Sequence, residues 1–143
     1  MVCIQGRVKK RPYLIPRFSD VSPYLRPAVQ RCEDSGIGVA IDEIPLCHLD
    51  GLEHHAANFF STAPRGQTEK IRPASCASCT LESLCAGVRP EYLEFFGAGE
   101  LQASAKDPAP IRARARRKAM GVPEFGRRGG PRWALRSRGT PGI

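Results

Sequence analysis

The chain has 143 residues, of which 41% are hydrophobic, with 14 glycines and 13 prolines. This length suits one domain, and the glycine and proline content predicts that part of the chain lacks a packed core. Its net charge of +8 comes from residues 104–143, which contain 11 Lys or Arg and 2 Asp or Glu. Residues 1–103 contain 11 Lys or Arg and 12 Asp or Glu and are nearly neutral. No apolar run of about 18 residues and no secretory leader is present, so we expect a cytoplasmic protein that does not enter a membrane.

The first half of the chain predicts a strand, a helix and a second strand. Residues 2–8 alternate apolar and polar side chains, as in a half-buried strand. Ser22 and Pro23 are suited to begin a helix, and Gly36 is suited to end it. Residues 37–41 form a continuous apolar run that is typical of a buried strand. The expected fold class is therefore α/β, with a small strand-helix-strand piece.

The second half predicts less regular structure. Residues 90–96 indicate a short helix, with Pro90 at its start and Gly97 as its cap. From about residue 104 onward, Pro, Gly and Arg dominate and the apolar periodicity is lost. We expect residues 104–143 to be a disordered basic tail.

Three cysteines lie within ten residues and point to a metal site. Cys76 and Cys79 are separated by two residues, a spacing that turns two sulfurs toward one ion or cluster, and Cys85 follows. A four-thiolate site needs one more ligand, and Cys47 is the best candidate because it follows the second predicted strand at the mouth of a loop. In a reducing compartment such cysteines indicate metal binding more often than disulfides.

The spacing leaves the metal open. Structural zinc usually takes two close-spaced ligand pairs, whereas iron–sulfur clusters accept thiolates from separate segments. His48, His54 and His55 are alternative zinc ligands, although we favour the interpretation that they are solvated or hydrogen-bonded loop residues. Cys32 is expected to face the core of the predicted helix, and Cys3 lies in the first predicted strand.

Several motifs in the same order resemble the C-terminal part of radical SAM proteins, in particular members with an auxiliary iron–sulfur cluster of the SPASM or twitch kind. The upstream part of the resemblance is Pro16-Arg17-Phe18-Ser19-Asp20-Val21 with Pro23-Tyr24-Leu25-Arg26, Gly36-Ile37 and Val39. The downstream part is Ile44-Pro45-Leu46-Cys47-His48-Leu49, Gly51, Glu53, Cys76-x2-Cys79-x5-Cys85-x-Gly87 and Tyr92-Leu93-Glu94-x-Phe96-Gly97-x-x-Glu100.

The resemblance implies that residues 1–46 are the end of a partial barrel and residues 47–103 an auxiliary-cluster module, followed by the tail. It also implies a [4Fe–4S] cluster on Cys47, Cys76, Cys79 and Cys85, which relays electrons or binds part of a substrate, usually a peptide. The Cys-x3-Cys-x2-Cys motif that holds the cluster for cleaving S-adenosylmethionine is absent. We therefore expect no catalysis by this chain alone, and S-adenosylmethionine only with a separate catalytic chain.

A second departure concerns Arg89, which stands where the full SPASM pattern has a further cysteine. The site thus resembles the shorter version with one cluster. The chain reads as the C-terminal piece of a radical SAM protein, from a truncated or split gene.

A different function remains open from the residues themselves. Four structural cysteines and a basic tail are also typical of a zinc-stabilised nucleic-acid-binding protein, with arginines on phosphates and Trp133 stacked on a base. A solvated tail without function is the simpler interpretation of residues 104–143.

Overall fold

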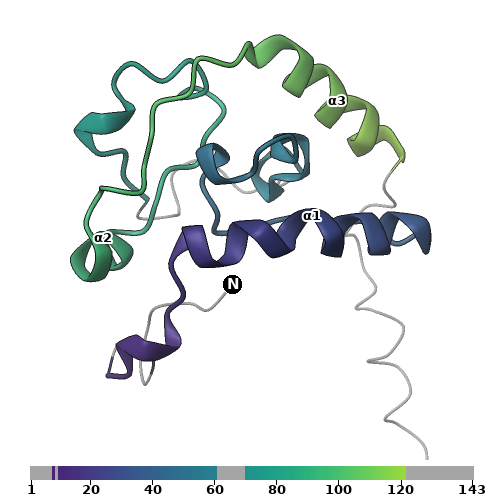
Figure 1. Cartoon of the computed structure of the whole chain (residues 1–143). Coiled ribbons are helices and arrows are strands. Elements are labelled where there is room, and N and C mark those ends of the chain that lie inside the picture. The colour runs from purple at the N-terminus through teal and green to yellow at the C-terminus, as the bar shows by residue number, and fades with distance from the viewer. Residues whose placement is uncertain (1–7, 9, 61–69, 122–143) are drawn as a thin grey trace, which may run out of the picture.

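The computed structural model describes residues 8, 10–60 and 70–121 of the chain (Figure 1). Three α-helices are present in this part: α1 (Phe18–Asp34), α2 (Pro90–Phe96) and α3 (Pro108–Gly121). The 3-10 turn η1 (Pro12–Leu14) precedes α1, and four more lie between α1 and α2: η2 (Leu46–His48), η3 (Glu53–His55), η4 (Ala57–Phe59) and η5 (Ala74–Cys76). None of the helices in the described ranges is long and apolar enough to cross a membrane.

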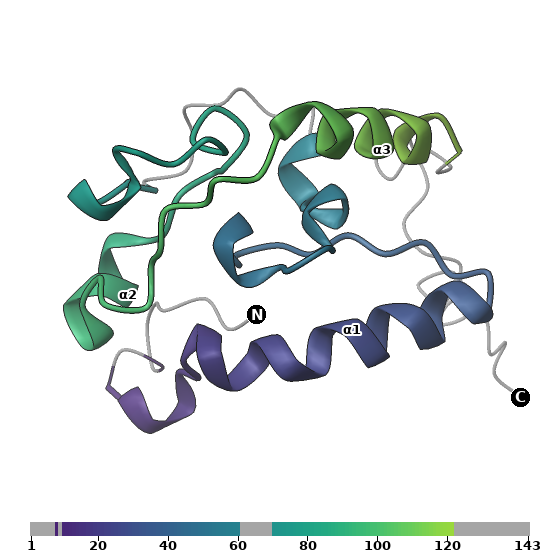
Figure 2. The ribbon, with the colours of Figure 1, turned by 45° about the horizontal axis from the view of Figure 1, so that its top comes forward.

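The two long helices lie on opposite sides of the molecule, and the η2–η4 segment lies between them (Figures 1 and 2). Val29 on α1 and Ile111 on α3 belong to one apolar cluster with the leucines of this middle segment. A second cluster joins the start of α1 to α2 and contains Phe18 and Tyr92. The buried residues of the first cluster are Val29, Ile41, Leu46, Leu49, Leu52, Ala56, Leu81, Leu84 and Ile111, and those of the second are Ile15, Phe18, Val88, Tyr92 and Leu101.

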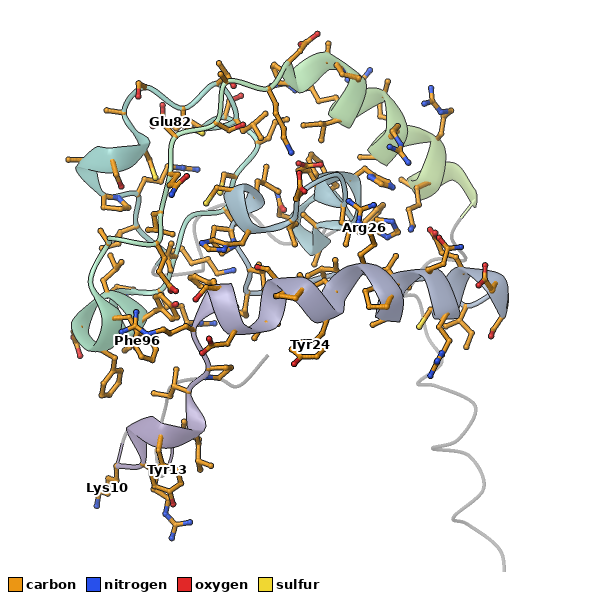
Figure 3. The ribbon with its side chains drawn as sticks, viewed as in Figure 1. Lys10, Tyr13, Tyr24, Arg26, Glu82 and Phe96 are labelled. Atoms are coloured by element: carbon orange, nitrogen blue, oxygen red, sulfur yellow. The ribbon has the colours of Figure 1, made fainter. Side chains whose placement is uncertain are left out.

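Helix α1 begins four residues before the predicted Ser22 cap. The Asp20 carboxylate accepts a hydrogen bond from the Arg17 backbone N–H at 3.3 Å, which closes the first turn. Pro23 and Pro27 lie inside the helix on its exposed side, where a carbonyl that loses its helical partner is open to water. Tyr24, next to them, projects away from α3 (Figure 3). The prediction of the helix was right, but its start was wrong.

The predicted α/β fold is wrong for the part of the chain that the structure describes. No strand forms there, and only two isolated bridges occur, the parallel pair Ile41–Ala56 and the antiparallel pair Ile71–Val88. The apolar run 37–41 has one bridging residue, and Ile37 is 58% exposed. A strand is stable only when it pairs along its length, and residues 37–40 have no such neighbour. The first predicted strand lies almost wholly outside the described residues.

The predictions for residues 90–96 and for residues 104–143 had different outcomes. Helix α2 spans the predicted residues and ends at Gly97, whose φ of 67° suits glycine. Residues 108–121, expected to be disordered, form α3 instead. Ile111 and Ala115 lie one turn apart on α3 and are both buried, so a single apolar stripe fixes an otherwise polar helix to the core. Residues 122–143 lie outside the described part.

Candidate metal centre

The four predicted ligands line one pocket. Cys47 comes from η2, Cys76 ends η5, and Cys79 and Cys85 come from the turns that follow. The remaining wall of the pocket is largely apolar, with Leu46, Leu81, Val88 and Leu101 among its residues, and Arg72, Glu82 and Gln102 add polar groups. Residues that are up to 38 positions apart in the sequence thus meet at one place.

Tight turns and buried leucines bring the three close-spaced cysteines together. The Cys79 N–H donates to the Cys76 carbonyl at 3.0 Å, which closes the turn between them. The Cys85 N–H donates to the Leu81 carbonyl at 2.9 Å. Leu81 and Leu84 are buried in the core and anchor this turn. Cys47 is placed in the same way, because Leu46 and Leu49 on either side of it are buried.

Three of the four sulfurs accept hydrogen bonds from backbone amides. The Gly87 N–H donates to Cys85 Sγ at 3.4 Å, and the Ser104 N–H donates to Cys79 Sγ at 3.3 Å. Cys47 is bonded in the same way by the Gln102 backbone. Such amide bonds stabilise a thiolate and tune the potential of any cluster that the thiolates hold.

The thiols are close enough to influence one another. Burial raises the pKa of Cys47, and the negative charges of Cys85 and Cys76 raise it further. Burial likewise raises the pKa of Cys76, followed by the charges of Cys85 and Cys79. Neighbouring thiols resist losing their protons together, because the resulting negative charges repel one another. A cation bound among the thiolates offsets this repulsion.

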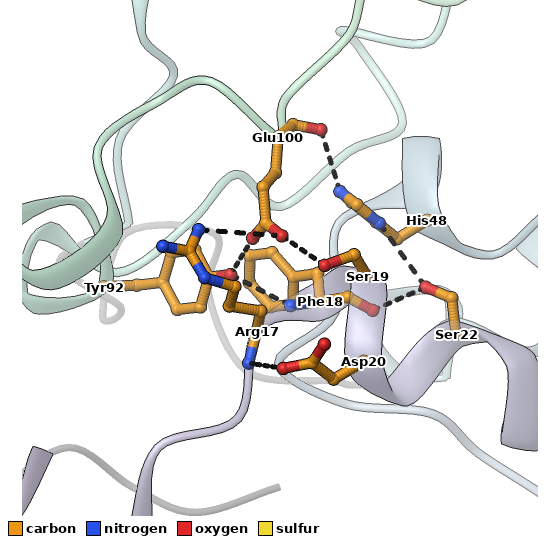
Figure 4. Close-up of polar contacts among 8 residues, drawn as sticks. All are labelled: Arg17, Phe18, Ser19, Asp20, Ser22, His48, Tyr92 and Glu100. Carbon is orange, nitrogen blue, oxygen red and sulfur yellow. Dashed lines mark hydrogen bonds and ion pairs between the residues drawn. The ribbon is translucent and has the colours of Figure 1, made fainter. Parts of the chain in front are cut away.

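Segment 98–106 supplies two of the amide donors, and a polar network around Glu100 holds it (Figure 4). The Glu100 carboxylate accepts hydrogen bonds from Ser19 Oγ at 2.5 Å and from the Tyr92 hydroxyl. The Tyr92 oxygen accepts one from the Phe18 N–H at 2.9 Å. His48 Nε2 lies 2.9 Å from the Glu100 carbonyl oxygen. The first turn of α1, the residue after Cys47 and α2 are thereby joined to the segment that bonds the sulfurs.

Gly87 occupies a position that only glycine fits. Its φ is +88°, and a Cβ atom there would lie 2.6 Å from the Ile71 carbonyl oxygen. Ile71 and Val88 pair through two backbone hydrogen bonds of 2.8 and 2.9 Å, which force this close approach. The same glycine carries the amide that bonds Cys85.

The other candidate ligands lie elsewhere. His48 belongs to the Glu100 network, and His54 and His55 are buried beside α3. Cys32 is half-buried on α1 and does not line the pocket. Cys3 lies outside the described residues. Within the ranges that the structure describes, no three His, Cys, Asp or Glu side chains are arranged to hold one metal ion.

The chemistry of the pocket nevertheless suits a thiolate-bound centre. Four sulfurs, largely apolar walls and amide donors to the sulfurs are the groups that iron–sulfur sites use, and four thiolates also suit zinc. Glu100 belongs to one of the motifs of the resemblance, but the sequence indicates no role for it. The backbone amides of Gln102 and Ser104 leave no side-chain signal in the sequence, so they could not be predicted. Comparison with known proteins finds no family model, no curated protein and no solved structure that matches this chain.

Proposed function

We propose that this chain is an iron–sulfur-cluster-binding module, similar to the auxiliary-cluster region of radical SAM proteins, that works with a separate catalytic chain. The observation that carries the proposal is the convergence of Cys47, Cys76, Cys79 and Cys85 on one pocket. The order of the motifs favours iron over zinc, and a [4Fe–4S] cluster over a smaller one, by resemblance only.

A cluster bound there would supply one-electron transfer or a binding point for substrate, which we take to be a peptide. The chain itself contributes four thiolates and the amide donors that offset their charge. It lacks the Cys-x3-Cys-x2-Cys motif, so cleavage of S-adenosylmethionine belongs to the partner chain. The raised pKa of Cys47 and of Cys76 indicates that metal binding releases protons, and that the site fills more readily as the pH rises.

Anaerobic purification tests the proposal most directly. We expect a brown protein with visible absorption from thiolate-to-iron charge transfer, and matching amounts of iron and acid-labile sulfide. A colourless protein with one zinc per chain would refute the iron assignment and leave a zinc-stabilised fold.

Single substitutions test the ligand set. Cys47→Ala should lose most of the bound iron, because it removes the ligand that comes from the separate segment. Cys32→Ala is the matched control, since Cys32 lies away from the pocket, and it should keep its iron. Circular dichroism of both variants shows whether each remains folded, and full iron content in Cys47→Ala would remove that residue from the site.

A further inference from the structure

The described structure changes the meaning of the basic residues after position 107. The basic residues between positions 112 and 118 lie on α3, which Ile111 and Ala115 fix to the core. Four arginines of this helix are exposed: Arg112, Arg114, Arg116 and Arg117. Helix α3 contains no acidic residue, so the molecule displays a rigid cationic surface.

The charges nearby leave most of this surface uncompensated. Lys118 is paired with Glu33 on α1 at 3.3 Å, and Arg112 donates to the Ser83 hydroxyl at 3.1 Å. Asp107, just before the helix, accepts the Ala109 N–H. In the described part of the chain, neither Arg116 nor Arg117 forms an ion pair.

We propose that the exposed face of α3 binds the phosphate backbone of a nucleic acid. From Arg112 to Arg117 the helix advances about 7.5 Å along its axis. Duplex DNA carries about four phosphate charges over that distance, at one per 1.7 Å. Arg112 and Arg116 lie one turn apart on the same side of the helix, with Arg117 next to Arg116, so these arginines can contact neighbouring phosphates together. Binding should depend on the charge of the nucleic acid and not on its base sequence, because phosphate contacts carry no base information.

An anionic membrane is a poorer match for the same helix. A helix that lies in a lipid surface buries a wide apolar face below its basic residues. Here the apolar residues Ile111 and Ala115 are already buried in the core of the protein. Ala113 between the arginines and Ala119 after Lys118 are exposed, and alanines offer little to the acyl chains.

The proposal is independent of the metal and is tested on the full chain. Fluorescence anisotropy is measured with a 20-nucleotide RNA and with a DNA duplex of the same length, between 50 and 200 mM salt. Arg116→Gln/Arg117→Gln should weaken binding at least tenfold at the lowest salt and reduce the slope of log K against log salt by about 2 on the duplex. Whichever of the RNA and the DNA duplex binds more tightly identifies the kind of nucleic acid.

Arg11→Gln/Arg31→Gln is the matched control, because it removes the same charge from exposed positions outside α3. It should change the affinity less than twofold. Equal effects of the two double variants would show that only net charge matters and would overturn the proposal. Equally tight binding to anionic phospholipid vesicles, or to polyglutamate of equal charge, would also overturn it.

Discussion

Glu100 and His55 both pack against α1, but the groups around them are opposite in kind. Burial raises the pKa of Glu100, yet hydrogen bonds from Ser19 and Tyr92 outweigh this, and the pKa lies below its usual range. Burial lowers the pKa of His55, and the charge of Lys118 lowers it further. The Glu100 network is therefore built around a charged acid, and the group of side chains around His55, here called the His55 centre, is built around a neutral base.

The two centres also hold different parts of the chain. The Glu100 network fixes segment 98–106, which bonds the cysteine sulfurs. The His55 centre fixes α3 to α1, because Lys118 contacts both His55 and Glu33. The cysteine pocket and α3 are thus held by different groups and can be disturbed separately.

Gly87→Ala should cause the largest loss of stability, beside the cysteine pocket. The added Cβ meets the Ile71 carbonyl at 2.6 Å in a backbone with φ of +88°. Strain of this kind and the displaced bridge should lower the free energy of unfolding by about 3 kcal/mol. Urea titration measures the change. Gly38→Ala is the matched control, because nothing lies within 4 Å of its Cβ position, and a comparable loss there would contradict the steric explanation.

Acidification should weaken the α3 side first. Burial, with the nearby charges of His55 and Arg114, lowers the pKa of His54 from 6.5 to about 4. Below pH 6.5 His54 is therefore protonated in the unfolded chain but stays neutral in the folded chain until the pH approaches 4. Stability should fall by about 3 kcal/mol as the pH drops from 6.5 to 4. The pKa of Glu100 is lowered from 4.5, so protonation of Glu100 destabilises the Glu100 network only below pH 4.5.

His54→Gln separates the two acid effects. Urea unfolding of this variant between pH 7 and 4 should lose the part of the pH dependence that comes from His54, whereas the part from His55, whose pKa is also lowered, and the loss below pH 4.5 remain. Amide hydrogen exchange should show that α3 opens before α2 in the wild-type protein. An unchanged pH profile in the variant would exclude His54 as the source.

Tyr92→Phe tests the Glu100 network with a smaller change. The ring stays and keeps its stacking on Phe18, at 3.9 Å between centroids. The lost hydroxyl leaves the buried Phe18 N–H without its acceptor and removes a donor to Glu100. We expect about 2 kcal/mol of destabilisation by urea titration. Tyr24→Phe, at a position that is 73% exposed, should be neutral, and an equal effect of both would argue against the network.

Lys118→Met should have the smallest effect on stability. The ion pair with Glu33 is partly exposed, so its loss costs about 1 kcal/mol or less. The pKa of His55 should rise, because the charge that depresses it is gone. NMR titration of the histidine ring measures this shift. Arg116→Met removes a charge from an exposed position of the same helix and should leave that pKa unchanged.

Local signals account for the elements that could be predicted. Pro90 and Gly97 mark both ends of α2 by backbone geometry alone, and Gly36, with φ of +68°, follows the end of α1. Sheet pairing could not be predicted, since the apolar run 37–41 does not specify a partner. The order in α3 could not be predicted either, because Ile111 and Ala115 are its only buried side chains among those described, too few to mark an apolar stripe among arginines.

The close spacing of Cys76, Cys79 and Cys85 is a local property of the chain, so the sequence alone was enough to group these thiols as a candidate site. That Cys47 lines the same pocket follows from tertiary packing, because the buried leucines beside it and the bridge between Ile71 and Val88 bring separate segments onto one core. Tertiary packing also decided that amides of segment 98–106 bond the sulfurs and that arginines lie on a fixed helix. Both outcomes depend on packing between distant residues, which no local pattern encodes.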